Sequence, residues 1–173
     1  MQITENTLSR AVEATQLFTV LEGDNRRRYR SSEPTQAVDY QFKRIYDVVG
    51  SEALVLCDNR GRDLASVGDK QLCRLLSHST PNLYSRSKAH LQVQMKGLEI
   101  IRPGIDSSNI SLSGIPLPVR NRKLFVASIS ESKFNEAGVL HATNGVSRIL
   151  GLGFPCRGVT VSSRDRLVYD ISR

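Results

Sequence analysis

The sequence of 173 residues contains no tryptophan and only five phenylalanines, five tyrosines and three cysteines. With so few aromatic side chains, leucine, isoleucine and valine must fill any hydrophobic core. The cysteines Cys57, Cys73 and Cys156 are odd in number and form no Cys-x-x-Cys pair, which argues against a disulfide framework or a zinc site. We expect Cys57 and Cys73 to act as small buried hydrophobic residues. The three histidines are scattered, and their spacing predicts no metal site.

Long hydrophobic runs are also missing. No stretch approaches the roughly 20 apolar residues that a membrane-spanning helix needs. Glu5 and Asn6 interrupt the start of the chain, so it does not resemble a signal peptide. We therefore expect no membrane span and a reducing, cytoplasmic location.

Basic residues exceed acidic ones, with a net charge of +7 and 18 arginines against six lysines. A basic surface favours an anionic partner but says nothing about the fold. The densest basic run lies in residues 23–35, which read either as a solvated connector or as a ligand for RNA, DNA or an anionic membrane. The residues that we expect to face a polyanion are Arg26, Arg27, Arg28, Arg30, Arg120, Arg122 and Lys123. No signature of a known nucleic-acid-binding fold accompanies them.

Hydrophobic spacing divides the chain into three parts. Residues 1–35 hold an amphipathic helix, over about 4–22, and the basic linker. Residues 36–150 form the main domain. Residues 151–173 form an extension in which 158–170 resemble a short β-hairpin. The pattern leaves open whether the first helix packs on its own domain or on a second chain.

In the first half of the main domain, the sequence pattern predicts a helix, a hairpin and a second helix. Val38, Phe42 and Ile45 lie on one face of a helix over 36–49. Strands over 53–57 and 62–67 flank a turn at 58–61, where glycine supplies a positive φ. Asp69 then caps a helix that we expect Pro81 to stop.

The second half predicts mainly strands. Leu91, Val93 and Met95 alternate with polar residues, which is typical of a strand with one wet face, and the extended segment continues to 101. A further strand is expected around Ile110 and Leu112, followed by an edge or irregular segment over Ile115–Val119 that carries two prolines. A strand over 123–129 and a last helix over 133–150 complete the domain. The predicted fold is α+β, with a five-stranded, mostly antiparallel sheet, helices on its faces and the order α-β-β-α-β-β-β-α.

The stretch ALVLCDNRGRDLASVGD, residues 53–69, resembles the first hairpin of the roadblock/LC7 domains, relatives of the longin and profilin-like folds. The resemblance covers about residues 36–150. It implies a non-enzymatic platform that forms homodimers and binds protein partners such as small GTPases or motor components. It also suggests two pairing surfaces, the helix that carries Val38, Phe42 and Ile45 and the strand that carries Leu91, Val93 and Met95.

Two alternatives remain. The segment GIPLPV, residues 114–119, followed by a strand over 124–129, is similar to the late strands of GAF-type sensory domains. Those domains hold a nucleotide, haem, tetrapyrrole or small metabolite in a pocket over the sheet. The third reading is a nucleic-acid-binding protein that uses the basic residues named above.

Motifs for catalysis are missing from the sequence. Asp58 and Asp63 flank the predicted turn, where Asp58 is expected to accept backbone hydrogen bonds and Asp63 to face solvent. No phosphate-binding glycine loop occurs. We expect no enzyme activity, no cofactor and no metal.

Overall fold

The computed structural model describes residues 32–85, 88–119, 121–152 and 157–160. The elements in chain order are α2 (Pro34–Val49), β1 (Ala53–Asp58), β2 (Asp63–Gly68), α3 (Lys70–Tyr84), α4 (Lys88–Ile101), a 3-10 turn (Ser107–Asn109), β3 (Ile110–Pro116), β4 (Lys123–Ile129), α5 (Asn135–Ile149) and β5 (Arg157–Thr160). The predicted helix over 4–22 and the linker up to residue 31 lie outside the described residues, as does most of the predicted C-terminal hairpin.

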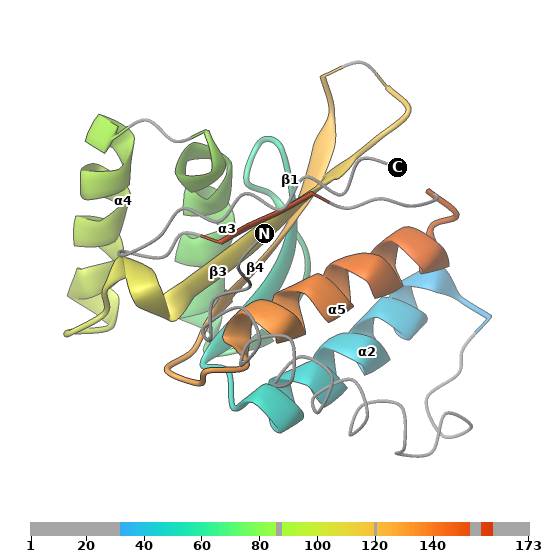
Figure 1. Ribbon diagram of the computed structural model, residues 1–173, viewed down its shortest axis with the longest axis horizontal. Coiled ribbons are helices and arrows are strands. Elements are labelled where there is room, and N and C mark those ends of the chain that lie inside the picture. The colour runs from blue at the N-terminus through green and yellow to red at the C-terminus, as the bar shows by residue number, and fades with distance from the viewer. Residues whose placement is uncertain (1–31, 86–87, 120, 153–156, 161–173) are drawn as a thin grey trace, which may run out of the picture.

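The strands form one antiparallel sheet in the order β2-β1-β4-β3-β5. Its centre is the β1–β4 ladder, in which Ala53 pairs with Ile129 and Asp58 with Leu124. Figure 1 shows α2 and α5 on one face of the sheet and α3 and α4 on the other. The result is a three-layer sandwich with a hydrophobic cluster on each side of the sheet.

The α+β class is as predicted, but the five-stranded domain and its element order are wrong. Residues 36–150 contribute four strands, because the segment around Leu91–Met95 is part of helix α4. The order in that domain is α-β-β-α-α-β-β-α. The short β5 comes from beyond the domain and adds to the outer side of β3.

Helix α4 forms because its apolar residues have helical spacing and most of its residues favour helices. Met95 and Leu98 stand three residues apart, and both join the cluster beneath α3, with Leu98 fully buried. Leucine, methionine, glutamine, lysine and glutamate are all good helix formers. An alternating apolar pattern over so few residues also fits one face of a helix. Gly97 is accommodated inside α4 and does not mark a break.

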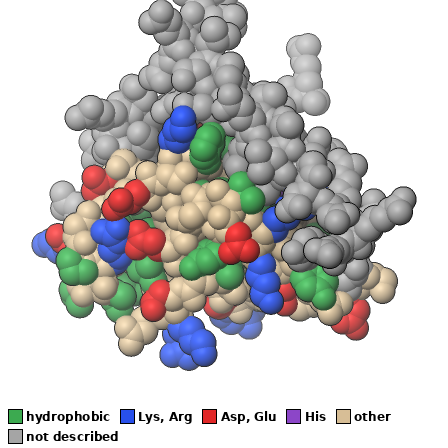
Figure 2. Space-filling model, turned by 90° about the horizontal axis from the view of Figure 1, so that it is seen from below, with side chains coloured by type: hydrophobic (Ala, Val, Ile, Leu, Met, Phe, Trp, Pro, Cys, Tyr) green, Lys and Arg blue, Asp and Glu red, His purple; other side chains and the backbone are tan. Residues whose placement is uncertain are grey.

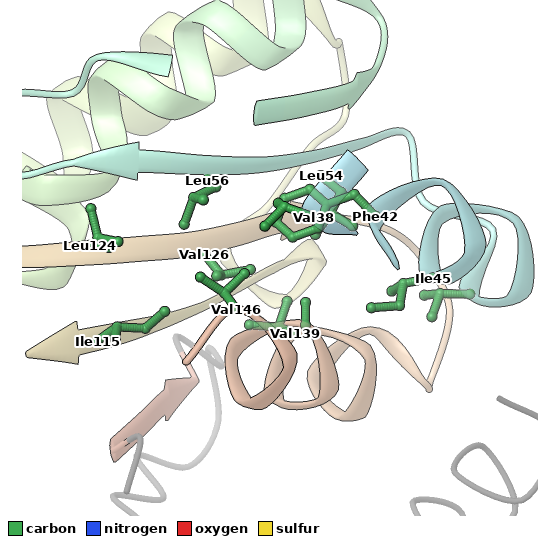
Figure 3. Close-up of a cluster of buried hydrophobic side chains, with 12 residues drawn as sticks. Val38, Phe42, Ile45, Leu54, Leu56, Ile115, Leu124, Val126, Val139 and Val146 are labelled. Carbon is green, nitrogen blue, oxygen red and sulfur yellow. The ribbon is translucent and has the colours of Figure 1, made fainter. Parts of the chain in front are cut away.

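The cluster between the sheet and the helices α2 and α5 explains the apolar stripe of α2. Val38, Phe42 and Ile45 are each at most 4% exposed. They pack together with strand residues such as Leu54 and with Val139 of α5 (Figure 3). The stripe therefore covers the sheet of its own chain.

Cys57 and Cys73 are both buried free thiols, and Cys73 belongs to the cluster on the opposite face. Their predicted role as small hydrophobic residues is confirmed. Cys57 faces inward from β1, and Cys73 comes from the first turns of α3.

The β1–β2 turn and the start of α3 also follow the prediction. Gly61 has φ 75°, and a Cβ there would lie 2.9 Å from the Cα of His78 on α3, so the turn requires glycine. The Asp69 carboxylate caps α3 by accepting from the N–H of Leu72 at 2.8 Å. The predicted stop at Pro81 is wrong, since α3 continues through Pro81 to Tyr84.

Candidate functional site

A small cleft lies at the end of the sheet where the β1–β2 turn meets the β3–β4 loop. The ladder places Asp58 opposite Leu124, so the turn after β1 and the loop before β4 are neighbours. The cleft has a volume of about 180 Å³. Its lining residues are Asp58, Asn59, Arg60, Arg62, Leu117, Arg122 and Lys123.

Asp58 organises the turn side of the cleft. One carboxylate oxygen accepts from the backbone N–H groups of Arg60 and Arg62 at 2.9 and 3.0 Å, as the sequence predicted. The other oxygen accepts from the Arg62 side chain at 2.7 Å. Burial alone would raise the pKa of Asp58, but the hydrogen bonds and charge of Arg62, with the N–H of Arg60, hold this pKa below its ordinary value. The single carboxylate of the cleft is thus ionised and already matched by one cation.

Three further cations line the cleft. The side chains of Arg60, Arg122 and Lys123 are exposed. No carboxylate in the described part of the chain forms an ion pair with any of them. Lys123 places its ammonium over the ring of Tyr84, 5.0 Å from the centroid. These three charges therefore make the cleft strongly positive.

The β3–β4 loop holds Arg122 by backbone hydrogen bonds. The N–H of Arg122 donates to the carbonyl of Val119, and its carbonyl accepts from the N–H of Leu117 at 3.0 Å. Asn121 adopts φ 58°, a left-handed conformation that asparagine tolerates better than most residues. These hydrogen bonds, together with the pairing of β1 and β4, place Arg122 beside the β1–β2 turn.

The structure describes only two of the seven residues that were expected to face a polyanion. Arg122 and Lys123 lie in the cleft, while Arg26, Arg27, Arg28, Arg30 and Arg120 lie outside the described residues. The sequence analysis missed Arg60 and Arg62 as members of the site. They lie about 60 residues before Arg122 and Lys123, and only the β1–β4 register would have brought them together.

The two expected pairing surfaces are not where the sequence placed them. Val38, Phe42 and Ile45 are buried in the core. Met95 is half-buried on α4, whereas the side chains of Leu91 and Val93 are not among those described. Since these residues belong to a helix, they cannot form the edge strand that was expected.

The outer face of α2 does not replace the buried stripe as an apolar surface. Its exposed positions include Asp39, Lys43 and Asp47. Figure 2 shows the molecule from the side on which α2 lies in Figure 1, and acidic and basic side chains alternate there with small apolar groups. This face is a mixed, solvated surface where it is described.

The strand order of the described sheet ends at β2 on one side and at the short β5 on the other, and β2 is the longer of these two edge strands. It stands at the end of the strand order, so in the described part of the chain nothing pairs with its outer side. All its side chains are exposed or half-exposed, and Leu64 is 48% exposed. An edge strand presents unpaired N–H and C=O groups to any strand that can approach it.

The buried thiols are poor nucleophiles. Burial, followed by the charge of Asp58, raises the pKa of Cys57 to about 12. Burial, followed by the charge of Asp63, raises the pKa of Cys73 to about 11. Across the residues that the structure describes, no three His, Cys, Asp or Glu side chains are grouped so that they could hold a metal ion.

The same described residues contain no helix that is both long and apolar enough to cross a membrane. No protein-family model matches the chain, and no curated protein or solved structure matches it either.

Proposed function

We propose that this protein is a non-enzymatic adaptor or regulatory module that self-associates through the open edge of β2 and binds a protein partner. The roadblock resemblance of residues 53–69 suggests a small GTPase as the class of partner. The free thiols Cys57 and Cys73 support a reducing, cytoplasmic location. The observation that carries the proposal is the unprotected edge strand.

Sheet edges are usually blunted by lysine, proline, a bulge or a covering element. The six residues of β2 include no lysine, arginine or proline, and Asp63 is their only charge. The single irregularity in the β1–β2 ladder lies near Cys57 and Asp63, so the pairing from Ala65 to Gly68 is regular. This leaves a regular, uncharged segment of the edge, from Ala65 to Gly68, that a second strand can extend.

A second copy of β2 is the simplest occupant. Two β2 strands running antiparallel would relate the subunits by a twofold axis, which is the commonest symmetry of protein dimers. The two sheets would then become one continuous sheet without a change in either subunit.

The other readings have less support from this geometry. A GAF-type pocket would lie over the sheet, where apolar side chains fill the space on both faces. The cleft described above lies instead at the strand ends.

Light scattering after size exclusion tests the proposal on the full chain. We expect a dimer at tens of micromolar. The double variant Leu64→Lys/Ser66→Lys places two charges on the exposed edge and should be a folded monomer, with an unchanged circular dichroism spectrum.

A matched control adds the same charge elsewhere. Thr35→Lys/Asn144→Lys lies at exposed positions of α2 and α5 and should remain dimeric. A monomeric wild-type protein would overturn the proposal, and so would a dimer that the control disrupts and the β2 variant does not.

A further inference from the structure

We propose that the cleft between the β1–β2 turn and the β3–β4 loop binds a small phosphate monoester. The cleft combines four cations from two turns with a single carboxylate. This inference is independent of the pairing proposed for β2, because it uses the strand ends and not the strand edge.

Charge argues for an anion. Asp58 takes one of the five N–H donors of Arg62, so most of that guanidinium remains available. Arg60 and Arg122 present two more guanidinium groups from opposite sides of the cleft. The planar fork of arginine matches the oxygens of a phosphate and can donate to two of them at once.

Size argues for a small ligand. A volume of about 180 Å³ equals about six water molecules at roughly 30 Å³ each. Pockets for drug-sized ligands or cofactors begin at roughly 300 Å³. One phosphoryl group with a compact substituent fits this space.

The surroundings argue against nucleic acid as the ligand. Single-stranded nucleic acid is held by aromatic side chains on which bases stack. No aromatic residue lines the cleft. The nearest ring named above, that of Tyr84, is covered by Lys123 on one side and packs on Phe125, with centroids 4.9 Å apart.

Hydrogen bonds that hold the backbone around the cleft support the binding of a phosphate there. The Asp58 carboxylate holds the β1–β2 turn through two backbone N–H groups, and the left-handed Asn121 shapes the opposite loop. Hydrogen bonds therefore hold the β1–β2 turn and the backbone of Arg122, which lowers the cost of ordering these backbones on binding.

Isothermal titration of the full chain with inorganic phosphate and with glycerol phosphate, in a low-salt buffer, tests the inference. We expect saturable binding of one ligand per chain, with chloride at equal ionic strength unable to compete. Arg122→Gln should weaken binding about tenfold, which corresponds to the loss of one charged hydrogen bond. Arg60→Gln should act in the same direction.

Arg148→Gln is the matched control. Arg148 is exposed on α5 and does not line the cleft, and its loss changes the net charge equally. Phosphate affinity should be unchanged in this variant. Because Arg60 and Arg122 are exposed, their variants should fold normally, and the dimer expected above should persist in them.

Three results would overturn the inference. The first is no saturable binding of either phosphate compound. The second is equal weakening by Arg148→Gln, which would indicate general charge attraction. The third is an oligonucleotide that binds more tightly than phosphate and is lost in the Arg122→Gln variant, which would assign the cleft to nucleic acid.

Discussion

Glycine at position 138 allows α5 to approach α2 closely. A Cβ added there would lie 2.7 Å from Cγ2 of Val49 and 3.3 Å from Cγ2 of Ile45. Both neighbours are β-branched residues whose side chains have little rotamer freedom in a helix. Ile45 belongs to the core shown in Figure 3. The two distances leave no space for a methyl group at position 138 unless a neighbour moves.

We therefore predict that Gly138→Ala destabilises the protein. Overpacking costs about 1–3 kcal/mol, and the better helix propensity of alanine returns up to about 1 kcal/mol. The net loss in the free energy of unfolding should be about 1–2 kcal/mol, measured by urea denaturation.

Gly97→Ala serves as the control. Gly97 also lies inside a helix, but a Cβ there would meet no atom within 4 Å. The same substitution should stabilise the protein by up to about 1 kcal/mol. Equal effects at both positions would contradict the close packing of α5 on α2.

At Asp58, the sequence predicted one set of hydrogen-bond partners and missed another. Its place in an Asp-x-x-Gly turn predicted that it would accept backbone N–H groups, and it does. Its second partner, the Arg62 side chain, did not follow from turn chemistry. That pairing matters for the cleft, because the Arg62 guanidinium offsets the one negative charge that would oppose an anion.

At the scale of elements, the sequence predicted the hairpin and its flanking helices and failed at α4. The strands β1, β2 and β4 and the helices α2 and α5 lie within two residues of their expected positions. Alternation over Leu91–Met95 was ambiguous, since the same residues also fit one face of a helix. Burial of Leu98 under α3 decided between the two, and that contact depends on tertiary structure.

An ion-pair network joins the end of α4 to two loops. Arg102 donates to both carboxylate oxygens of Glu52 at 2.8 Å and to Glu131 at 2.7 Å. Its hydrogen bonds, opposed in part by burial, hold the pKa of Glu52 below its ordinary value. Glu52 precedes β1 and Glu131 follows β4, so one guanidinium fixes three segments.

We predict a loss of stability in acid through this network. The folded pKa of Glu52 is lowered, so the stabilisation is present above the ordinary value of roughly 4.3 and is lost as the pH falls through the folded pKa. Glu52→Gln should be slightly less stable at neutral pH and should lose less stability than the wild type between pH 5 and 3, by thermal melts. Parallel pH curves for the two proteins would show that the pair contributes nothing.

At the scale of the whole molecule, the reactivity of the buried thiols measures how often the fold opens. Cys57 and Cys73 are 0% and 2% exposed, and their raised pKa values leave almost no thiolate at neutral pH. In a Cys156→Ser background, we predict no reaction with a thiol reagent in native buffer at pH 8. Two thiols per chain should react in denaturant, as measured by absorbance.

Reaction of one thiol under native conditions would contradict this prediction. It would mean that α3 separates from the sheet without global unfolding, because Cys57 contacts Thr80 of α3 and Cys73 is buried on α3 itself.

The candidate site belongs to the whole molecule and was the part least visible in the sequence. Arg122 and Lys123 were singled out as basic residues, but their partners come from a turn that is distant in the chain. The sequence does not show which residues of β1 and β4 pair with one another. That pairing register brings the two turns together. The open edge at β2 was missed for the same reason, since strand order across the sheet comes from non-local pairing.

The β1–β4 ladder also has a consequence for synthesis on the ribosome. β1 is buried along its whole length, and its central partner is made about 70 residues later. Until β4 emerges, a nascent chain can form the β1–β2 hairpin and α3 but leaves an apolar strand without its neighbour. Such intermediates fold slowly and aggregate readily. We therefore expect the growing polypeptide to depend on chaperones during translation more than the finished protein does.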